Sequence, residues 1–255
     1  MRRLKSTAIV ALVLTLTGHP LARADETVAL KAGYQNLSPS GQIAGRRNDV
    51  GTRIDIDEDM NLGSSNDVTG EVALQLGRSR LSLGYLPLGF RGRGQMTISG
   101  TYKGQPFTAS DPVDSSLGLG LYDFAYAFYL INADDLPVRL QAGPEVAVKV
   151  ADASIDFADT AAGIEDHDSA TVAIPVLGAR ARVALADYLG VVGRLGYLEY
   201  DADRFLDAEV QVEFSPLPLL GVYAGYRTFA LKIDRSDLLV DVHLAGPFAG
   251  AFARF

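Results

Sequence analysis

Apolar and polar residues alternate with a period of two along most of this 255-residue chain. Because successive side chains of a β-strand point to opposite faces, such alternation places one face in an apolar medium and the other in a polar one. The clearest stretch covers 205–214, in which Leu206, Ala208, Val210, Val212 and Phe214 alternate with Asp207, Glu209, Gln211 and Glu213. The pattern predicts an all-β protein.

The first 24 residues have the features of a secretory signal peptide. Arg2, Arg3 and Lys5 form a basic start, the apolar run 8–17 follows, and Ala22-Arg23-Ala24 supplies the small residues of a cleavage site. The apolar run is shorter than the roughly 18 residues that a membrane-spanning helix needs. We therefore expect an exported protein with a signal peptide over 1–24 and a single folded domain over 25–255.

Composition excludes several classes of function. The formal net charge is −8, and it becomes −12 once the basic residues of the expected signal peptide are removed. An acidic chain lacks the basic face of a nucleic-acid-binding protein. The absence of cysteine excludes disulfides, thiolate metal sites and cysteine nucleophiles.

The connections between the alternating segments fall into two classes. Those at 77–79, 132–137, 184–187 and 215–218 are short, whereas the alternate set is mostly long, at 37–69, 91–116 and 151–169, with short exceptions at 201–204 and 234–237. Short turns at one end and long loops at the other are typical of a closed transmembrane β-barrel with periplasmic turns and extracellular loops. We expect about ten antiparallel strands, with eight or twelve as alternatives, near 27–36, 70–77, 80–90, 117–131, 138–150, 170–183, 190–200, 205–214, 220–232 and 238–255.

Several short motifs resemble those of known barrels. The last strand ends on Phe255, which resembles the signal that the bacterial barrel-assembly machinery reads. Together with the loop asymmetry, the chain resembles small Gram-negative outer-membrane barrels of the OmpA, OmpX and OmpW kind. A group of uncharacterised proteobacterial barrels is similar at 54–57, 62–63, 225–227 and 246–248. The resemblance implies the cell outer membrane as location, and membrane lipid, lipopolysaccharide and the assembly machinery as partners.

A membrane barrel turns its apolar face outward and its polar face into the lumen, whereas a soluble barrel does the reverse. With the signal peptide and Phe255 favouring the membrane, the polar face becomes the lining of a narrow lumen. Charges in so narrow a space must pair, since an isolated buried ion is strongly unfavourable. The expected lumen network comprises Arg139, Glu145, Lys149, Arg180, Arg182, Arg194, Asp207, Glu209, Glu213, Arg227, Asp241 and His243, with Lys31 and Arg80 beside them.

Three functions are compatible with this interpretation. The first is a narrow channel or passive facilitator for small solutes, and the second is a non-conducting structural or adhesive barrel whose loops bind lipopolysaccharide or a partner. The third is a protease, because the pairs Asp55/Asp57 and Asp241/His243 resemble those of the ten-stranded omptins. Both pairs are short patterns, so we expect no enzyme activity, catalytic residue, metal or cofactor. The acidic segment around His167 is interpreted as a solvated loop.

Overall fold

Ten long antiparallel strands form a closed ring in the computed structural model, which confirms the expected fold class and strand number. The structure describes residues 28–45, 53–95, 100–102, 105–107, 112–133, 138–159, 164–201, 203–234 and 238–255, so the expected signal peptide lies outside the described residues. The strands of the ring are β1 (Val28–Gly45), β3 (Ser65–Leu76), β4 (Ser79–Gln95), β7 (Pro112–Phe128), β9 (Arg139–Asp159), β10 (Ile164–Ala186), β11 (Leu189–Tyr200), β12 (Asp203–Phe214), β13 (Leu220–Asp234) and β14 (Leu238–Arg254).

The ring closes where the last strand pairs with the first, through fifteen register pairs between β14 and β1. A line of directly paired residues that starts at Val28 passes once around the ring and returns to β1 at Ser40. The shear is therefore twelve residues for ten strands. Such a stagger requires the strands to tilt strongly against the barrel axis.

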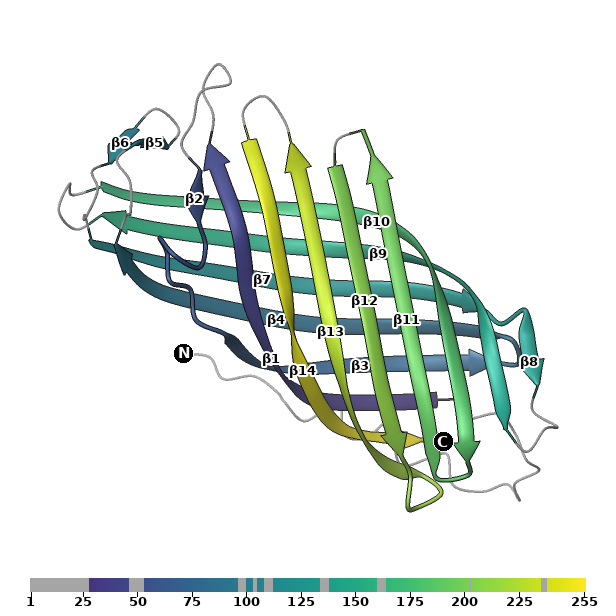
Figure 1. Cartoon of the computed structure of the whole chain (residues 1–255). Helices are drawn as coiled ribbons and strands as arrows, with labels where there is room; N and C mark the ends of the chain where they lie inside the picture. The colour runs from purple at the N-terminus through teal and green to yellow at the C-terminus, as the bar shows by residue number, and fades with distance from the viewer. Residues whose placement is uncertain are drawn as a thin grey trace, which may run out of the picture.

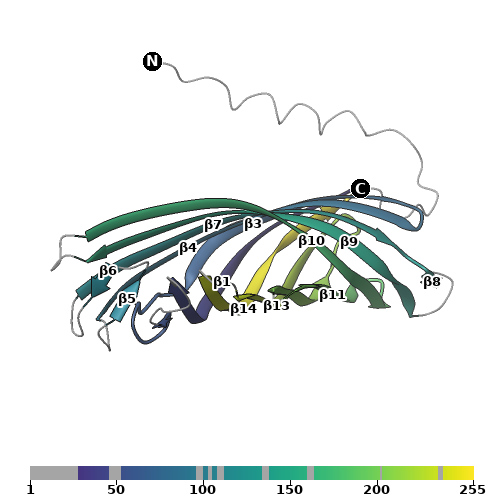
Figure 2. The same ribbon diagram turned by 90° about the horizontal axis from the view of Figure 1, so that it is seen from above.

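This tilt divides the barrel into two facing walls. In Figure 1, β1, β14, β13, β12 and β11 run steeply in front, and β3, β4, β7, β9 and β10 cross behind them. The view in Figure 2 shows these two groups on opposite sides of a flattened cross-section. Side chains that are far apart in sequence consequently meet in the space between the walls.

The two ends of the barrel differ as expected. At the end that holds Phe255, β3 and β4 are joined by a tight turn in which Gly77 has a φ of +59°, a conformation that favours glycine. At the opposite end, β5 (Gly100–Tyr102) and β6 (Gln105–Phe107) form a separate hairpin, and β2 (Ile54–Asp55) pairs with β1. A short strand at the Phe255 end, β8 (Ile131–Ala133), pairs with β9.

The strands extend further into the expected loops than the sequence indicated. Residues 151–169 were expected to form a loop, but β9 and β10 pair continuously from Ala184↔Arg139 to Ile164↔Asp159. Above the apolar belt both faces of a strand can be wet, so alternation no longer marks where the strand ends. The wall of β4, β7, β9 and β10 is therefore longer than β11 and β12.

The outer face of the barrel carries an apolar belt. Side chains such as Leu83, Phe124 and Val210 are about half exposed although they are large and apolar, and Tyr34, Tyr85, Tyr122 and Tyr226 lie among them on the outer face. An outward apolar band with aromatic side chains is the surface that a hydrocarbon environment covers. Among the described residues, no helix is long and apolar enough to cross a membrane.

Candidate functional site

The interior of the barrel holds a network of buried ion pairs, centred on Lys149 of β9. Its Nζ atom lies 2.7 Å from a carboxylate oxygen of Asp123 on β7 and 2.7 Å from one of Asp207 on β12. Arg194 of β11 binds the same Asp123 through Nη1 at 2.5 Å and also pairs with Glu145 of β9. All five side chains are buried, and together they connect the two walls.

A third cation extends this central group along the front wall. Arg227 of β13 donates to both carboxylate oxygens of Asp207, with its Nη2 atom 3.1 Å from Oδ2. Its Nη1 atom lies 3.5 Å from Glu209 of the neighbouring strand. The guanidinium also lies 4.5 Å from the ring centroid of Phe229, a cation–π distance.

A second group of ion pairs lies nearer the Phe255 end and is centred on Glu213 of β12. This carboxylate pairs with Lys31 at 3.1 Å, with Arg182 at 3.5 Å and with Arg254. Gln211 donates a further hydrogen bond to it at 2.7 Å. Four strands thereby converge on one buried acid.

Pairing makes so many buried charges compatible with a folded barrel. A separate pair, Arg80–Glu71 at 2.9 Å, joins β4 to β3. Lys31 and Arg254 also lie over the rings of Tyr223 and Phe252, at 5.2 and 4.0 Å from their centroids. Removing one partner of a buried pair leaves an uncompensated ion, so each member depends on the others.

An apolar cluster fills the part of the lumen that lies beyond the charged groups, away from the Phe255 end. Inward-facing side chains from both walls form it, and they include Leu37, Leu86, Leu88, Phe90, Leu121, Phe205, Phe229 and Leu244. Four side chains of the segment 53–64 complete it, namely Ile54, Ile56, Met60 and Leu62. We call this set the apolar cap. It explains why β4, β7 and β10 have apolar residues on both faces.

The polar side chains of the segment 53–64 fix its local conformation. Asp55 Oδ1 accepts hydrogen bonds from the backbone N–H groups of Asp57 (2.9 Å) and Glu58 (3.1 Å). The N–H of Asp55 in turn donates to Asp59 Oδ2 at 2.8 Å. Bonds of this kind close a local turn, and the bridge Leu62↔Gly92 attaches its end to β4.

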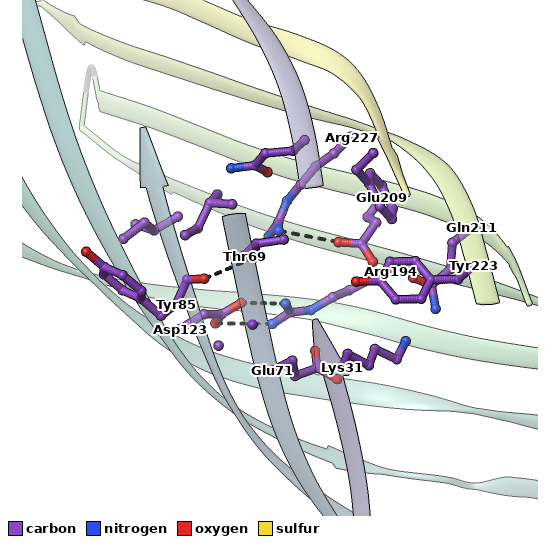
Figure 3. A pocket seen from close by; sticks show the side chains of 16 residues that line it. Lys31, Thr69, Glu71, Tyr85, Asp123, Arg194, Glu209, Gln211, Tyr223 and Arg227 are labelled. Atoms are coloured by element: carbon purple, nitrogen blue, oxygen red, sulfur yellow. Dashed lines mark hydrogen bonds and ion pairs between the residues drawn. The ribbon is translucent and has the colours of Figure 1, made fainter. Parts of the chain in front are cut away.

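A small polar cavity remains between the charged groups. Its volume is about 60 Å³, and Lys31, Glu71, Asp123, Arg194 and Arg227 are among its lining residues. Figure 3 shows Arg194 bonded to Asp123 in its lining, with Arg227 and Glu209 at one side and Tyr85 at the other. A polar space of this size holds a few water molecules.

The structure brings most of the expected lumen residues together, but not all. Inward-facing positions hold Glu145, Lys149, Arg180, Arg182, Arg194, Asp207, Glu209, Glu213 and Arg227, together with Lys31 and Arg80. Arg139 lies at the rim of the Phe255 end, where it pairs with the exposed Asp187 at 3.2 Å.

Asp241 and His243 differ from expectation, because both are exposed on the outer face of β14. The expectation put Asp241 and His243 in the lumen although Phe255, also at an odd-numbered position, was expected to face the lipid. Both can hold only if a bulge, for example at Gly246-Pro247, changes the alternation between them. The register of β14 against β13 instead runs without a shift from Leu239 to Ala253. Since Leu244, Phe248 and Phe252 are buried inside, the odd-numbered positions face outward.

The two pairs that resemble those of the omptins are consequently not gathered in the lumen. Asp55 is paired in register with Gln42, and Gln42 with Asp241. Directly paired residues share one face of a sheet, and the exposed Gln42 and Asp241 mark it as the outer face. Phe255 also lies outside at 52% exposure, with its backbone bonded to Val28.

Sequence reasoning missed three members of the network: Glu71, Asp123 and Arg254. Asp123 is a single charge between Tyr122 and Phe124. It lies on the same face of the strand as Ala125 and Ala127, which are buried in the structure, and this alternation with the large aromatic residues could have indicated that Asp123 faces the lumen. Within the described part of the chain, no group of three His, Cys, Asp or Glu side chains is arranged to hold a metal ion. The side chains at 155–168, including His167, lie outside that part.

Comparisons with known proteins identify the fold. No protein-family model matches the chain, and no curated protein matches it. Among solved structures, the outer membrane protease OmpT of Escherichia coli is similar with a TM-score of 0.56 at 12% identity, covering 92% of this chain and 99% of OmpT. Ail, the attachment invasion locus protein of Yersinia pestis, has a TM-score of 0.37 at 11% identity, covering 91% of this chain and 100% of Ail. The chain thus has the closed antiparallel fold of outer-membrane β-barrel proteins.

Proposed function

We propose that this chain is an integral outer-membrane barrel that is closed along its axis and acts through its extracellular side. The apolar belt supports insertion in a membrane, and the expected signal peptide and Phe255 favour the outer membrane. The observation that carries the proposal is the filled lumen. Two groups of ion pairs and the apolar cap lie one above another between the walls.

The chemistry of the two layers argues against free passage of solutes. Among the described residues, the side chains that form the apolar cap offer no polar group, so an ion that enters between them loses hydration without replacement, which is strongly unfavourable. An apolar solute that passes the cap meets side chains that are already paired with one another. Each layer therefore blocks the class of solute that the other would admit.

The long wall indicates where a closed barrel would act. β4, β7, β9 and β10 extend beyond the ends of β11 and β12, and the hairpin β5–β6 lies at the same end. Loops and strand extensions above the membrane are where barrels present binding surfaces. A partner or the sugar portion of lipopolysaccharide is the class of ligand that this side would meet.

A narrow channel is the second candidate, and the polar cavity of about 60 Å³ favours it. A channel would require the segment 53–64 to leave the cap, because Ile56 and Met60 are almost fully buried there. The two candidates therefore differ in whether this segment moves.

Solute efflux from proteoliposomes tests the proposal. Refolded protein is reconstituted into liposomes that are loaded with a small dye or, separately, with potassium ions. Protein-free liposomes loaded with the same solute are the reference. We expect efflux at the rate of the protein-free liposomes, both for the natural chain and for the surface variant Arg93→Ala. Efflux above that rate from the natural chain would support the channel instead.

A further inference from the structure

The wall between β3 and β4 contains a gap in its backbone ladder. The two strands pair from Leu76↔Ser79 to Gly70↔Tyr85 and no further. β3 nevertheless continues to Ser65 against β1, and β4 continues to Gln95 against β7. The bridge Leu62↔Gly92 joins the wall again above the gap. We call the space between 65–69 and 86–90 the window.

Pro87 explains why the ladder stops. Alternate residues of a strand direct their backbone groups to the same neighbour. On β4, the carbonyl of Tyr85 and the N–H of Gly89 both face β3, because they bond to Thr69 and Ser65 of that strand. The missing N–H of Pro87 is therefore one that would have bonded to β3.

Side chains close the window in place of the backbone. Thr69 Oγ1 donates to the carbonyl of Tyr85 at 2.9 Å, and the N–H of Gly89 donates to Ser65 Oγ at 2.9 Å and to Asp67 Oδ2 at 3.1 Å. Gln35 donates to the carbonyl of Pro87 at 3.4 Å. Side-chain bonds of this kind break without any shift of strand register, so the window can open locally.

The polar cavity lies directly behind the lower end of the window. Its lining includes Thr69, Gly70 and Tyr85 from the edge of the window, together with Glu71 and Lys31 from the lumen. Tyr85 itself faces outward and packs against Tyr122, with ring centroids 4.8 Å apart and the rings tilted by 31°. The cavity therefore touches residues of the inner and the outer face at this one seam (Figure 3).

We propose that the window is a lateral portal, through which small polar molecules reach the charged cavity from the side of the barrel. The class of ligand is a compact hydrogen-bonding molecule, of about the size of glycerol or urea. The inference rests on the proposed function, since a side route matters only where the axis is closed. Tyr34, Tyr85 and Tyr122 are exposed on the outer face around the window, and tyrosine is enriched where a barrel meets the membrane interface.

The chain has no cysteine, so a single introduced thiol reports access to the cavity. Gly84 lines the cavity, and a Cβ at this position would lie 3.6 Å from the Cβ atom of Asp123, an ordinary contact. The probe is 2-hydroxyethyl methanethiosulfonate, a small neutral polar reagent, applied to refolded Gly84→Cys protein. Heat-modifiable gel migration shows that each variant is folded.

Three backgrounds separate the window from other routes. Thr69→Val removes the hydroxyl that closes the window, so we expect modification of Gly84→Cys to become about tenfold faster. Pro87→Val restores an N–H toward β3, and we expect modification to become slower. Thr171→Val is the matched control, because its hydroxyl bonds to Asp152 at 3.2 Å in the seam between β9 and β10. We expect that control to leave the rate unchanged.

The outcomes distinguish this proposal from the proposed function. Equal modification rates in all three backgrounds would overturn the window, whether the reagent enters elsewhere or never reaches the thiol. Equal rates together with ionic current across a bilayer would overturn the closed axis as well. Rates that follow the window substitutions, with no ionic current, support both.

Discussion

Lys149 on β9 and Asp207 on β12 form an ion pair of 2.7 Å, although two strands separate them in the wall. Both side chains are buried, at 1% and 2% exposure. Lys149 also binds Asp123, and Asp207 also binds Arg227. The pair is thus one of the points at which the back and front walls are joined through the lumen.

Replacing Lys149 should destabilise the barrel strongly. Lys149→Met leaves Asp123 and Asp207 with one cation fewer in a buried site, and breaking such a pair costs about 3–5 kcal/mol. The measurement is the free energy of unfolding in urea, in lipid vesicles. Arg139→Met is the matched control, because its pair with Asp187 is exposed and worth about 0–1 kcal/mol. Equal effects of the two substitutions would contradict a buried junction.

Glu213 should matter more than any single one of its partners. Glu213→Gln removes the carboxylate that Lys31, Arg182 and Arg254 share, so this buried charge no longer offsets the three neighbouring cations. We expect a loss of about 3–5 kcal/mol in the same unfolding measurement. Arg182→Met leaves Glu213 with two cations and should cost less. The reverse order would show that the acid is not the centre of this group.

A charge in the apolar cap should detach the segment 53–64 from the lumen while the barrel remains folded. Ile56→Asp places a charge in the apolar cap, and burying a charge without a partner is strongly unfavourable. We expect faster proteolysis within 53–64, with the barrel itself still folded by its gel migration. Asp57→Ala, at an exposed position of the same segment, is the control and should not change the cleavage rate. Resistance of Ile56→Asp to cleavage would mean that the cap does not hold the segment.

The outward position of His243 gives a depth-dependent prediction. Val210→Arg places a charge on the apolar belt and should cost about 2–4 kcal/mol, as expected near the middle of a bilayer. His243 lies on the outer face near Lys232 and Asp241. His243→Arg should therefore lower the free energy of unfolding by only about 0–1 kcal/mol, as expected near the interface. Unfolding in vesicles measures both. A large penalty for His243→Arg would place that side chain in the lumen or deep in the membrane.

The sequence predicts the ring of strands well because alternation is enforced wherever one face meets an apolar medium. Leu206 to Phe214 follow the pattern without exception and form β12. Prediction failed where that constraint ends. Above the belt, Asp152 and Ser169 were expected in a loop but lie within β9 and β10.

The composition of the lumen was only partly predictable. Polar residues that alternate with apolar ones predicted that Lys149 and Asp207 face the lumen. Which residue a buried charge pairs with depends on the shear of the barrel, and short alternating segments do not reveal the shear. The apolar cap could not be predicted either. Leu86, Leu88 and Phe90 are ordinary strand residues in sequence, and only the packing of 53–64 against them shows that they face inward.

Single-channel conductance of the refolded protein in a planar bilayer tests the closed axis most directly. The natural chain is compared with Lys149→Glu, which reverses one charge at the centre of the lumen. We expect no discrete openings from the natural chain under conditions in which gel migration shows a folded barrel. Discrete openings whose ion selectivity changes in Lys149→Glu would contradict the account and establish a pore lined by this network.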